Sequence, residues 1–139
     1  MLQVSEIKET AVRLGENDNL ISCILLVGSY ARNEQKPDSD IDLVVISKDK
    51  NKMINIHDWI KKMGEIDSEI KIEYCGEITS LRINCNGIEY ELGIGSAKWI
   101  ELPLDSGTRK VLEDGYIVMY EKDNVMKNVK SEVREREEV

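Results

Sequence analysis

Hydrophobic positions along the chain follow two different spacings, and these spacings predict its first helices and strands. Apolar residues recur at helical intervals from Val4 to Leu14 and again from Asn51 to Met63. Gly15 and Gly64 follow these two segments and are expected to end the helices. Residues Leu20 to Val27 are apolar almost throughout, which predicts a central strand that is covered on both faces.

The rest of the chain reads mainly as strands separated by turn residues. Asn86-Gly87 is the strongest hairpin signal, a two-residue turn with positive backbone angles, and it joins predicted strands at residues 81–85 and 88–95. The further predicted elements are a short helix capped by Ser29, a strand from Asp40 to Ile46, a strand from Ile70 to Cys75, a helix capped by Ser106 or Asp105 and ended by Gly115, a strand from Tyr116 to Tyr120 and a closing helix from Asn124 to Val139.

The segment ILLVGSYARNEQKPDSDIDLVVI, residues 24–46, holds the clearest candidate chemistry. An apolar strand ends in Gly28-Ser29, a turn-rich connection follows, and Asp40 and Asp42 open a second apolar strand. Side chains alternate between the faces of a strand, so the two carboxylates point the same way. A glycine lets a phosphate approach the backbone closely, and a serine offers it a hydroxyl and an amide. The pattern therefore favours a phosphate-binding turn beside a pair of acids.

These residues resemble the nucleotidyltransferase superfamily that includes DNA polymerase beta. More narrowly, GSYAR with SDIDLVV is similar to the small bacterial nucleotidyltransferase domains, whose usual form is Gly-Ser-aromatic-Ala-Arg-Gly. Asn33 stands in place of the last glycine, and because Asn tolerates left-handed backbone angles we expect the turn to persist. The resemblance covers most of residues 20–123, including the G-x-E-x-E hairpin, Trp99 and the segment PLDSGTRKVLEDG.

The resemblance implies a reaction and a co-substrate. A nucleoside monophosphate, AMP in the first place, would pass from a nucleoside triphosphate such as ATP to a hydroxyl group, with release of pyrophosphate. The acceptor would be a small molecule, such as an aminoglycoside-like or lincosamide-like antibiotic, or a protein side chain. Gly28, Ser29 and Arg32 would bind the triphosphate.

The resemblance also implies a metal site built from acids. Asp40 and Asp42 would share two Mg²⁺ ions, because magnesium prefers hard oxygen ligands. A third carboxylate from residues 88–95 would complete the set, with Glu91 as the first choice and Glu89 as the alternative. The superfamily commonly has Asp at this third position, and a glutamate is one methylene longer.

The charge of the chain narrows the possible acceptors. The chain carries a net charge of -8 with a pI near 4.8, and it contains no basic cluster longer than a pair such as Lys61-Lys62. Nucleic-acid binding draws most of its affinity from phosphate neutralisation by Lys and Arg. DNA and RNA are therefore disfavoured, and a small molecule or a protein is the expected acceptor.

An antitoxin-like binding partner is the alternative function. The resemblance implies it, because stand-alone domains of this kind are often paired with a small helical toxin that they block by contact or by adenylylation. The acidic composition and a length that leaves no room for a separate acceptor-binding domain agree with it.

The order of the elements predicts the fold class. We expect an α/β (α+β) fold with a mixed, largely antiparallel sheet and helices mainly on one face, as in the polymerase beta-like nucleotidyltransferase fold. Residues 1–139 are expected to form one domain with a core at about 20–123 and a C-terminal helix at about 124–139.

Cysteine usage and hydropathy indicate the compartment. Cys23, Cys75 and Cys85 lie in predicted strands and are expected to be buried thiols of a reducing cytosol. The first residues lack the apolar core of a signal peptide, and no apolar run approaches the roughly 20 residues of a membrane span. We therefore expect a cytoplasmic protein. His57 is expected to be an exposed helical residue without a metal role.

Overall fold

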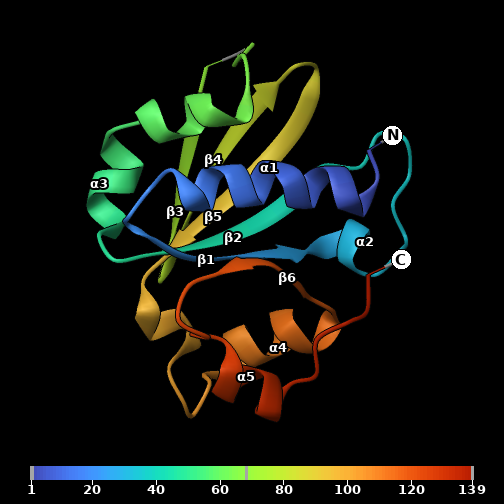
Figure 1. The fold of residues 1–139 in the computed structure, drawn as a ribbon, viewed down its shortest axis with the longest axis vertical. Coiled ribbons are helices and arrows are strands. Elements are labelled where there is room, and N and C mark those ends of the chain that lie inside the picture. Colours follow the sequence, from blue (N-terminus) through green and yellow to red (C-terminus); the bar gives the residue numbers. More distant parts are fainter. Residues whose placement is uncertain (1, 68, 139) are drawn as a thin grey trace.

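A six-stranded mixed sheet forms the centre of the molecule (Figure 1). The computed structural model describes residues 2–67 and 69–138. The strands are β1 (Ile21–Val27), β2 (Ile41–Ser47), β3 (Lys71–Cys75), β4 (Ile78–Cys85), β5 (Ile88–Gly95) and β6 (Ile117–Glu121). Their order across the sheet is β3-β4-β5-β2-β1-β6, with β2 parallel to β5 and the other neighbours antiparallel. The predicted fold class, a mixed and largely antiparallel sheet with helices, is confirmed.

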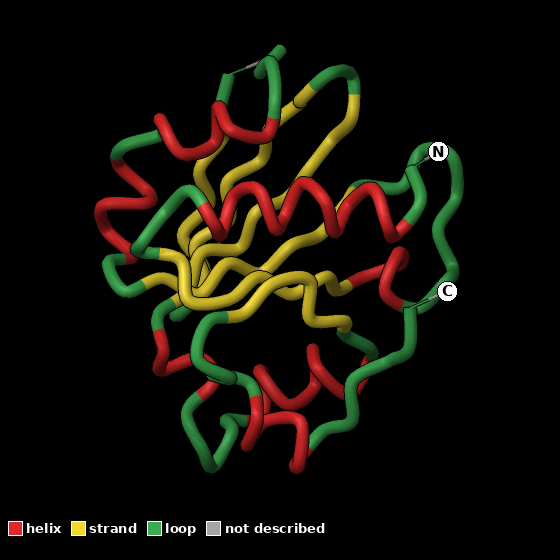
Figure 2. Tube along the Cα trace, viewed as in Figure 1, coloured by secondary structure: helices red, strands yellow, loops and turns green. Residues whose placement is uncertain are grey.

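Helices cover both faces of this sheet (Figure 2). They are α1 (Val4–Glu16), α2 (Gly28–Ala31), α3 (Lys50–Asn55), the 3-10 helices η1 (Asp58–Met63) and η2 (Ala97–Ile100), α4 (Ser106–Asp114) and α5 (Lys127–Glu132). The longest helix, α1, packs on one face together with α3 and η1, while η2, α4 and α5 lie on the other. The second face is thus covered more fully than the sequence indicated.

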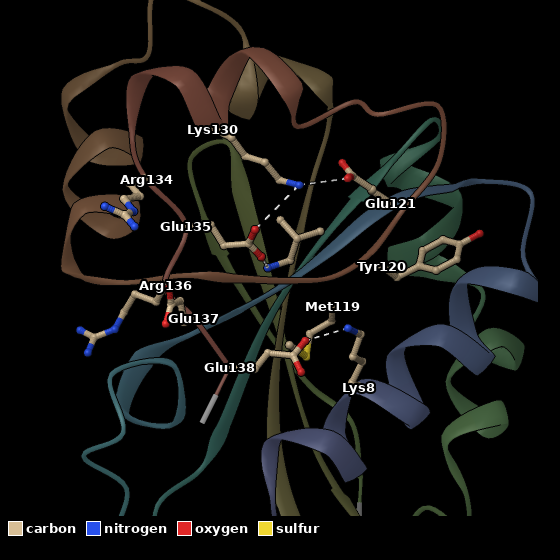
Figure 3. A pocket seen from close by; sticks show the side chains of 11 residues that line it. Lys8, Met119, Tyr120, Glu121, Lys130, Arg134, Glu135, Arg136, Glu137 and Glu138 are labelled. Carbon is tan, nitrogen blue, oxygen red and sulfur yellow. Dashed lines mark hydrogen bonds and ion pairs between the residues drawn. The ribbon is translucent and has the colours of Figure 1, made fainter.

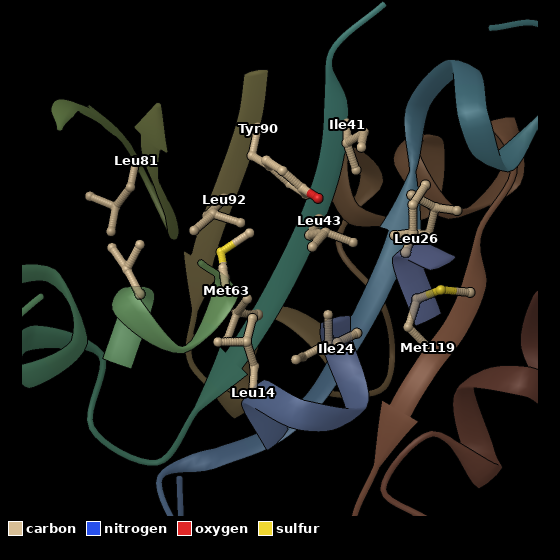
Figure 4. Close-up of a cluster of buried hydrophobic side chains, with 14 of the residues drawn as sticks. Leu14, Ile24, Leu26, Ile41, Leu43, Met63, Leu81, Tyr90, Leu92 and Met119 are labelled. Carbon is tan, nitrogen blue, oxygen red and sulfur yellow. The ribbon is translucent and has the colours of Figure 1, made fainter. Parts of the chain in front are cut away.

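The first face buries the larger hydrophobic cluster (Figure 4). Ile7, Ala11 and Leu14 form the buried stripe of α1, which confirms the helical spacing seen in the sequence. Alternate residues of the strands meet this stripe. The strand residues in this cluster include Ile24, Leu26, Ile41, Leu43, Leu81, Leu92 and Met119.

The second face buries a smaller cluster that is built from the intervening strand residues. Leu25 of β1 and Val44 of β2 pack there with Trp99, Leu112 and Tyr116. Because β1 contributes buried side chains to both clusters, its nearly continuous apolar sequence is explained by its central position. The same alternation directs Asp42, two residues before Val44, to this second face.

Local turn chemistry follows the predictions. Asn33 has a φ of 57°, so it occupies the left-handed region that the missing glycine would fill. Asn86 and Gly87 have φ values of 52° and 79°, as the hairpin prediction requires. Of the two proposed caps for α4, Asp105 is the one that accepts the N–H of Thr108, at 3.0 Å.

The single helix predicted from Asn51 to Met63 is wrong, because the structure breaks it into α3 and η1 with His57 between them. Ile54 and Trp59 are five residues apart, which in one straight helix would point them about 140° away from each other. The break buries both, and the indole N–H of Trp59 donates to the Met53 carbonyl at 2.8 Å. His57 is half-buried outside a helix rather than exposed on one.

The closing helix predicted at about 124–139 is also wrong in its extent; Val139 lies outside the described residues. Helix α5 ends at Glu132, and the chain then runs beside the edge strand β6. The Arg136 N–H donates to the Tyr116 carbonyl at 2.9 Å, and the Val118 N–H donates to the Glu135 carboxylate at 2.6 Å. The edge strand β6 exposes backbone N–H and C=O groups that need hydrogen-bond partners. The chain after Glu132 supplies such partners instead of continuing the helix.

The cysteine prediction is correct for two residues and wrong for the third. Cys23 and Cys85 are buried, and burial raises the pKa of the Cys23 thiol to about 12. Cys75 is exposed because it ends β3, the edge strand at the far side of the sheet. None of the helices formed by residues 2–67 and 69–138 is long and apolar enough to cross a membrane.

We predict that Tyr116→Phe lowers the free energy of unfolding by about 1–2 kcal/mol, because a buried acceptor loses its donor. The Tyr116 hydroxyl donates to the Val133 carbonyl at 2.6 Å, and this bond holds the C-terminal segment against the sheet. Urea denaturation measures the change. Tyr74→Phe is the matched control, since Tyr74 is 73% exposed and should stay within about 0.5 kcal/mol of the wild type. Equal effects of the two substitutions would contradict the prediction.

Candidate active site

A row of polar residues crosses the sheet at the start of β2. Asp42 is the register partner of Val27 on β1 and of Glu91 on β5, and Glu91 is in turn the partner of Arg82 on β4. Residues opposite one another in neighbouring strands project to the same face. The parallel pairing of β2 with β5 therefore places the carboxylates of Asp42 and Glu91 side by side.

Asp40 joins this row from the residues just before β2. Its Oδ2 atom lies 3.4 Å from Nη1 of Arg82, and Nη2 of the same guanidinium lies 3.5 Å from Oε2 of Glu91. The side chains of Asp40 and Glu91 are 31% and 30% exposed, so both remain accessible to solvent and ligands. The structure thus brings together all three acids that the sequence singled out, Asp40, Asp42 and Glu91.

The pKa of Asp42 is strongly shifted. Burial, followed by a hydrogen bond with Glu91 and the negative charges of Glu91 and Asp40, raises the pKa of Asp42 from its ordinary value of 3.8 to about 7. The positive charge of Arg82 acts in the opposite direction. Like charges held this close disfavour each other, so this cluster is suited to take up a cation.

Gly28 lies directly against this cluster. It has a φ of +74°, and a Cβ atom built there would lie 2.2 Å from Oδ2 of Asp42. The backbone can therefore approach the carboxylate only because no side chain intervenes. Ser29 follows as the second residue of α2 and is half-buried. Gly28, the first residue of this turn, thus lies next to Asp42.

Arg32 occupies a different position from the one that its predicted role suggests. Its Nε atom lies 2.7 Å from Oε1 of Glu34, and its Cγ atom lies against Gly115. Its closest charged partner is therefore a neighbouring surface acid and not a member of the carboxylate cluster. Tyr30 is buried in the first core cluster, in agreement with a packing role.

The two candidates for the third acid differ in their neighbours. Glu91 contacts Arg82 and is hydrogen-bonded with Asp42, whereas Glu89 is the register partner of Asn84. Glu89 lines a cavity of about 410 Å³ that Arg82 also lines. Geometry therefore favours Glu91 as the partner of Asp42 and leaves Glu89 at the edge of an adjoining cavity.

The three acids supply the kind of ligand that a divalent metal takes. As the side chains stand, no three His, Cys, Asp or Glu residues within 2–67 and 69–138 form a group that could hold a metal ion. The chemistry of Asp40, Asp42 and Glu91 nevertheless fits Mg²⁺, which takes hard carboxylate oxygens. The Asp42 carboxylate occupies the space that a Cβ at position 28 would fill, so the glycine leaves room for this carboxylate beside the turn. The donor chemistry of these residues therefore fits the metal, although their side chains are not yet grouped around one position.

Arg82 is the member of the cluster that sequence reasoning missed. Its signal was present in the hairpin, because a two-residue turn at Asn86-Gly87 fixes the pairing of β4 with β5. Counting back from that turn pairs residue 82 with residue 91. A basic residue facing a candidate metal ligand could have been found in this way.

Another cavity lies away from the acids (Figure 3). It has a volume of about 620 Å³ and is lined by β6, the C-terminal segment and Lys8. Several of its charges are paired, with Lys130 between Glu121 and Glu135 and Lys8 bonded to Glu138. It is the crevice where the tail meets the sheet edge, and neither Asp40, Asp42 nor Glu91 lines it.

A family of known proteins matches the chain. The family model described as nucleotidyltransferase domain matches residues 4–93, which is more than half of the 139 residues. The match includes Gly28, Asp40, Asp42, Arg82 and Glu91, and it ends within β5. None of the curated proteins searched matches the chain.

We predict that Gly28→Ala destabilises the protein by about 1 kcal/mol more than Gly76→Ala. Both glycines have positive φ values, +74° and +68°, so both substitutions carry backbone strain of about 1 kcal/mol. A Cβ at Gly76 meets nothing within 4 Å, whereas at Gly28 it must turn the Asp42 carboxylate away from Glu91. Equal losses in chemical denaturation would show that the contact with Asp42 is unimportant.

Proposed function

The chain belongs to the nucleotidyltransferase domain family, so its activity class is nucleotidyl transfer, and we propose that it moves AMP from ATP to a hydroxyl group of a small molecule or a protein. The observation that carries this proposal is the convergence of Asp40, Asp42 and Glu91 on one face of the sheet beside Gly28. Three carboxylates beside an open glycine turn suit a triphosphate that arrives with its cations.

The proposed reaction is a displacement at the α-phosphorus. The acceptor oxygen forms a bond to phosphorus, the bond from phosphorus to the pyrophosphate oxygen breaks, and the hydroxyl proton passes to a carboxylate. Glu91 is our first choice for that proton, since its side chain is 30% exposed and so accessible to an acceptor. Bound Mg²⁺, held by Asp40, Asp42 and Glu91, would stabilise charge on the attacking and leaving oxygens.

Gly28 and Ser29 are proposed to receive the triphosphate. The absence of a side chain at Gly28 leaves its backbone directly beside Asp42, and Ser29 supplies a hydroxyl and an amide at the start of α2. Arg32 would have to exchange its ion pair with Glu34 for a phosphate oxygen. That pair is partly exposed, so the exchange is inexpensive.

We predict that the wild-type protein binds a non-hydrolysable ATP analogue in the presence of Mg²⁺, and that the double substitution Asp40→Asn with Asp42→Asn weakens this binding at least about tenfold. The loss follows from removing two of the three anionic metal ligands. Isothermal titration calorimetry measures both affinities.

Asp38→Asn is the control for that experiment. Asp38 is an exposed acid two residues before Asp40, so the substitution changes charge in the same segment without altering the cluster. It should leave the affinity within about twofold of wild type. The absence of analogue binding by the wild type, or unchanged binding by the double variant, would overturn the proposed function.

We predict that labelled ATP and Mg²⁺, added with the protein to native lysate, transfer label to an acceptor. Glu91→Gln should abolish this transfer and Glu89→Gln should retain it, because Glu91 alone of the two is hydrogen-bonded with Asp42. A labelled metabolite would support a small-molecule acceptor. A labelled helical protein that co-purifies would support the antitoxin-like alternative, and transfer by the Glu91 variant would remove Glu91 from the mechanism.

A further inference from the structure

Arg82 already occupies part of the space that the proposed metal would need. Its guanidinium spans two acids, with Nη1 3.4 Å from Oδ2 of Asp40 and Nη2 3.5 Å from Oε2 of Glu91. These are two of the three carboxylates in the proposed metal set. A carboxylate oxygen that interacts with the guanidinium interacts less strongly with a divalent cation. The guanidinium and a divalent cation therefore compete for these oxygens.

The ion pairs of Arg82 with these acids are weak enough to break. Both distances lie beyond the usual range for a strong charge-assisted bond, and neither contact is a close parallel pair of hydrogen bonds. All three side chains are about one third exposed, so water screens their attraction. A divalent cation carries twice the charge on a smaller radius and can replace the guanidinium.

The released side chain would stay in a favourable field. Arg82 lines the cavity of about 410 Å³ together with two acids, Glu69 and Glu89, and one base, Lys71. The charge of Glu91, followed by those of Glu73, Asp40 and Glu89, raises the pKa of Arg82, so the guanidinium stays charged wherever it turns. By turning toward Glu73 and Glu89, the guanidinium would exchange its pairs with Asp40 and Glu91 for two other acids.

Counting charges shows what the cluster lacks. Asp40, Asp42 and Glu91, when ionised, carry three negative charges, and Arg82 balances one of them. A divalent cation that replaces Arg82 balances two of the three charges, where the guanidinium balanced one. The chain thus supplies a partial substitute for the metal but not a full one.

We propose that the Arg82 guanidinium competes with a divalent metal ion for the same carboxylates. It pairs with Asp40 and Glu91 when no metal is bound and leaves them when a divalent cation enters. Arg82 thereby sets the metal concentration at which the site fills. This proposal rests on the proposed function, because it takes the same three acids as the metal ligands. Arg82 is thereby a positioning residue that acts through the carboxylates.

The test is the affinity for Mn²⁺ in the absence of nucleotide. Arg82→Gln removes the competing charge while keeping a polar side chain, and we expect the Kd for Mn²⁺ to fall about tenfold, equivalent to about 1.4 kcal/mol. The melting temperature of the metal-free variant should fall while its rise on adding Mn²⁺ becomes larger. A merely structural role, or a role in orienting the ligands, would instead weaken metal binding.

Arg109→Gln is the matched control. Arg109 also lies between two acids, 3.8 Å from Glu113 and 3.5 Å from Glu132, and it is 39% exposed. The substitution makes the same change in net charge on α4, away from the cluster. Its Mn²⁺ affinity should stay within about twofold of the wild type. Unchanged or weaker Mn²⁺ binding by Arg82→Gln would overturn the proposal, as would equal tightening in both variants.

A measurement on the wild-type chain keeps the proposal testable should Arg82→Gln fold poorly. The nuclear magnetic resonance signal of the Arg82 side-chain Nε–H should shift during a Mg²⁺ titration with the midpoint of metal binding, while that of Arg109 stays in place. An Arg82 signal that does not respond to bound metal would show that the guanidinium does not leave.

The outcomes separate this proposal from the proposed function. Failure of the wild type to bind Mn²⁺ both alone and with the ATP analogue would overturn the metal-dependent function itself, and this proposal with it. Normal binding by the wild type without tightening in Arg82→Gln would overturn the role of Arg82 alone.

Discussion

The parallel pairing of β2 with β5 sets Asp42 beside Glu91, and the candidate site depends on this one contact. Antiparallel neighbours on either side complete the row with Val27 and Arg82. Parallel strands cannot be joined by a tight turn, so the chain between them must cross over. That crossover contains α3, η1, β3 and β4. The segment that covers the first face of the sheet therefore also delivers Arg82 to the acids.

One part of the second face of the sheet is buried by apolar packing, and another part carries the charged residues of the candidate site. Val44 packs in its apolar cluster, while Asp42, two residues earlier on the same face, lies among other charges. On β5, Gly93 and Gly95 follow Glu91, and Ile78 closes over both glycines. The acids thus stand where the apolar layer ends. This partial burial is the first cause of the raised pKa of Asp42, and it makes a compensating cation valuable there.

Local features were predictable because each depends on residues that are close in the sequence. The left-handed angles of Asn33 and Asn86 and the cap at Asp105 follow from the chemistry of single side chains. The helix predicted at 51–63 and the closing helix at 124–139 were wrong in extent, although their apolar residues are largely buried. Burial of the Trp59 side chain and hydrogen bonding to the edge of β6 both depend on tertiary contacts. These contacts, and not the local spacing of apolar residues, determine where the two helices end.

The sequence by itself determined the two ends of the candidate site: a glycine turn after a buried strand, and two acids that alternation places on one face of the next. It also determined the family, through those same residues. Only the tertiary structure decided that Glu91 stands opposite Asp42 and that Arg82 reaches Asp40, 42 positions away along the chain. The physical reason is that pairing of distant strands is fixed by how both faces of the whole sheet are buried, which no local pattern records.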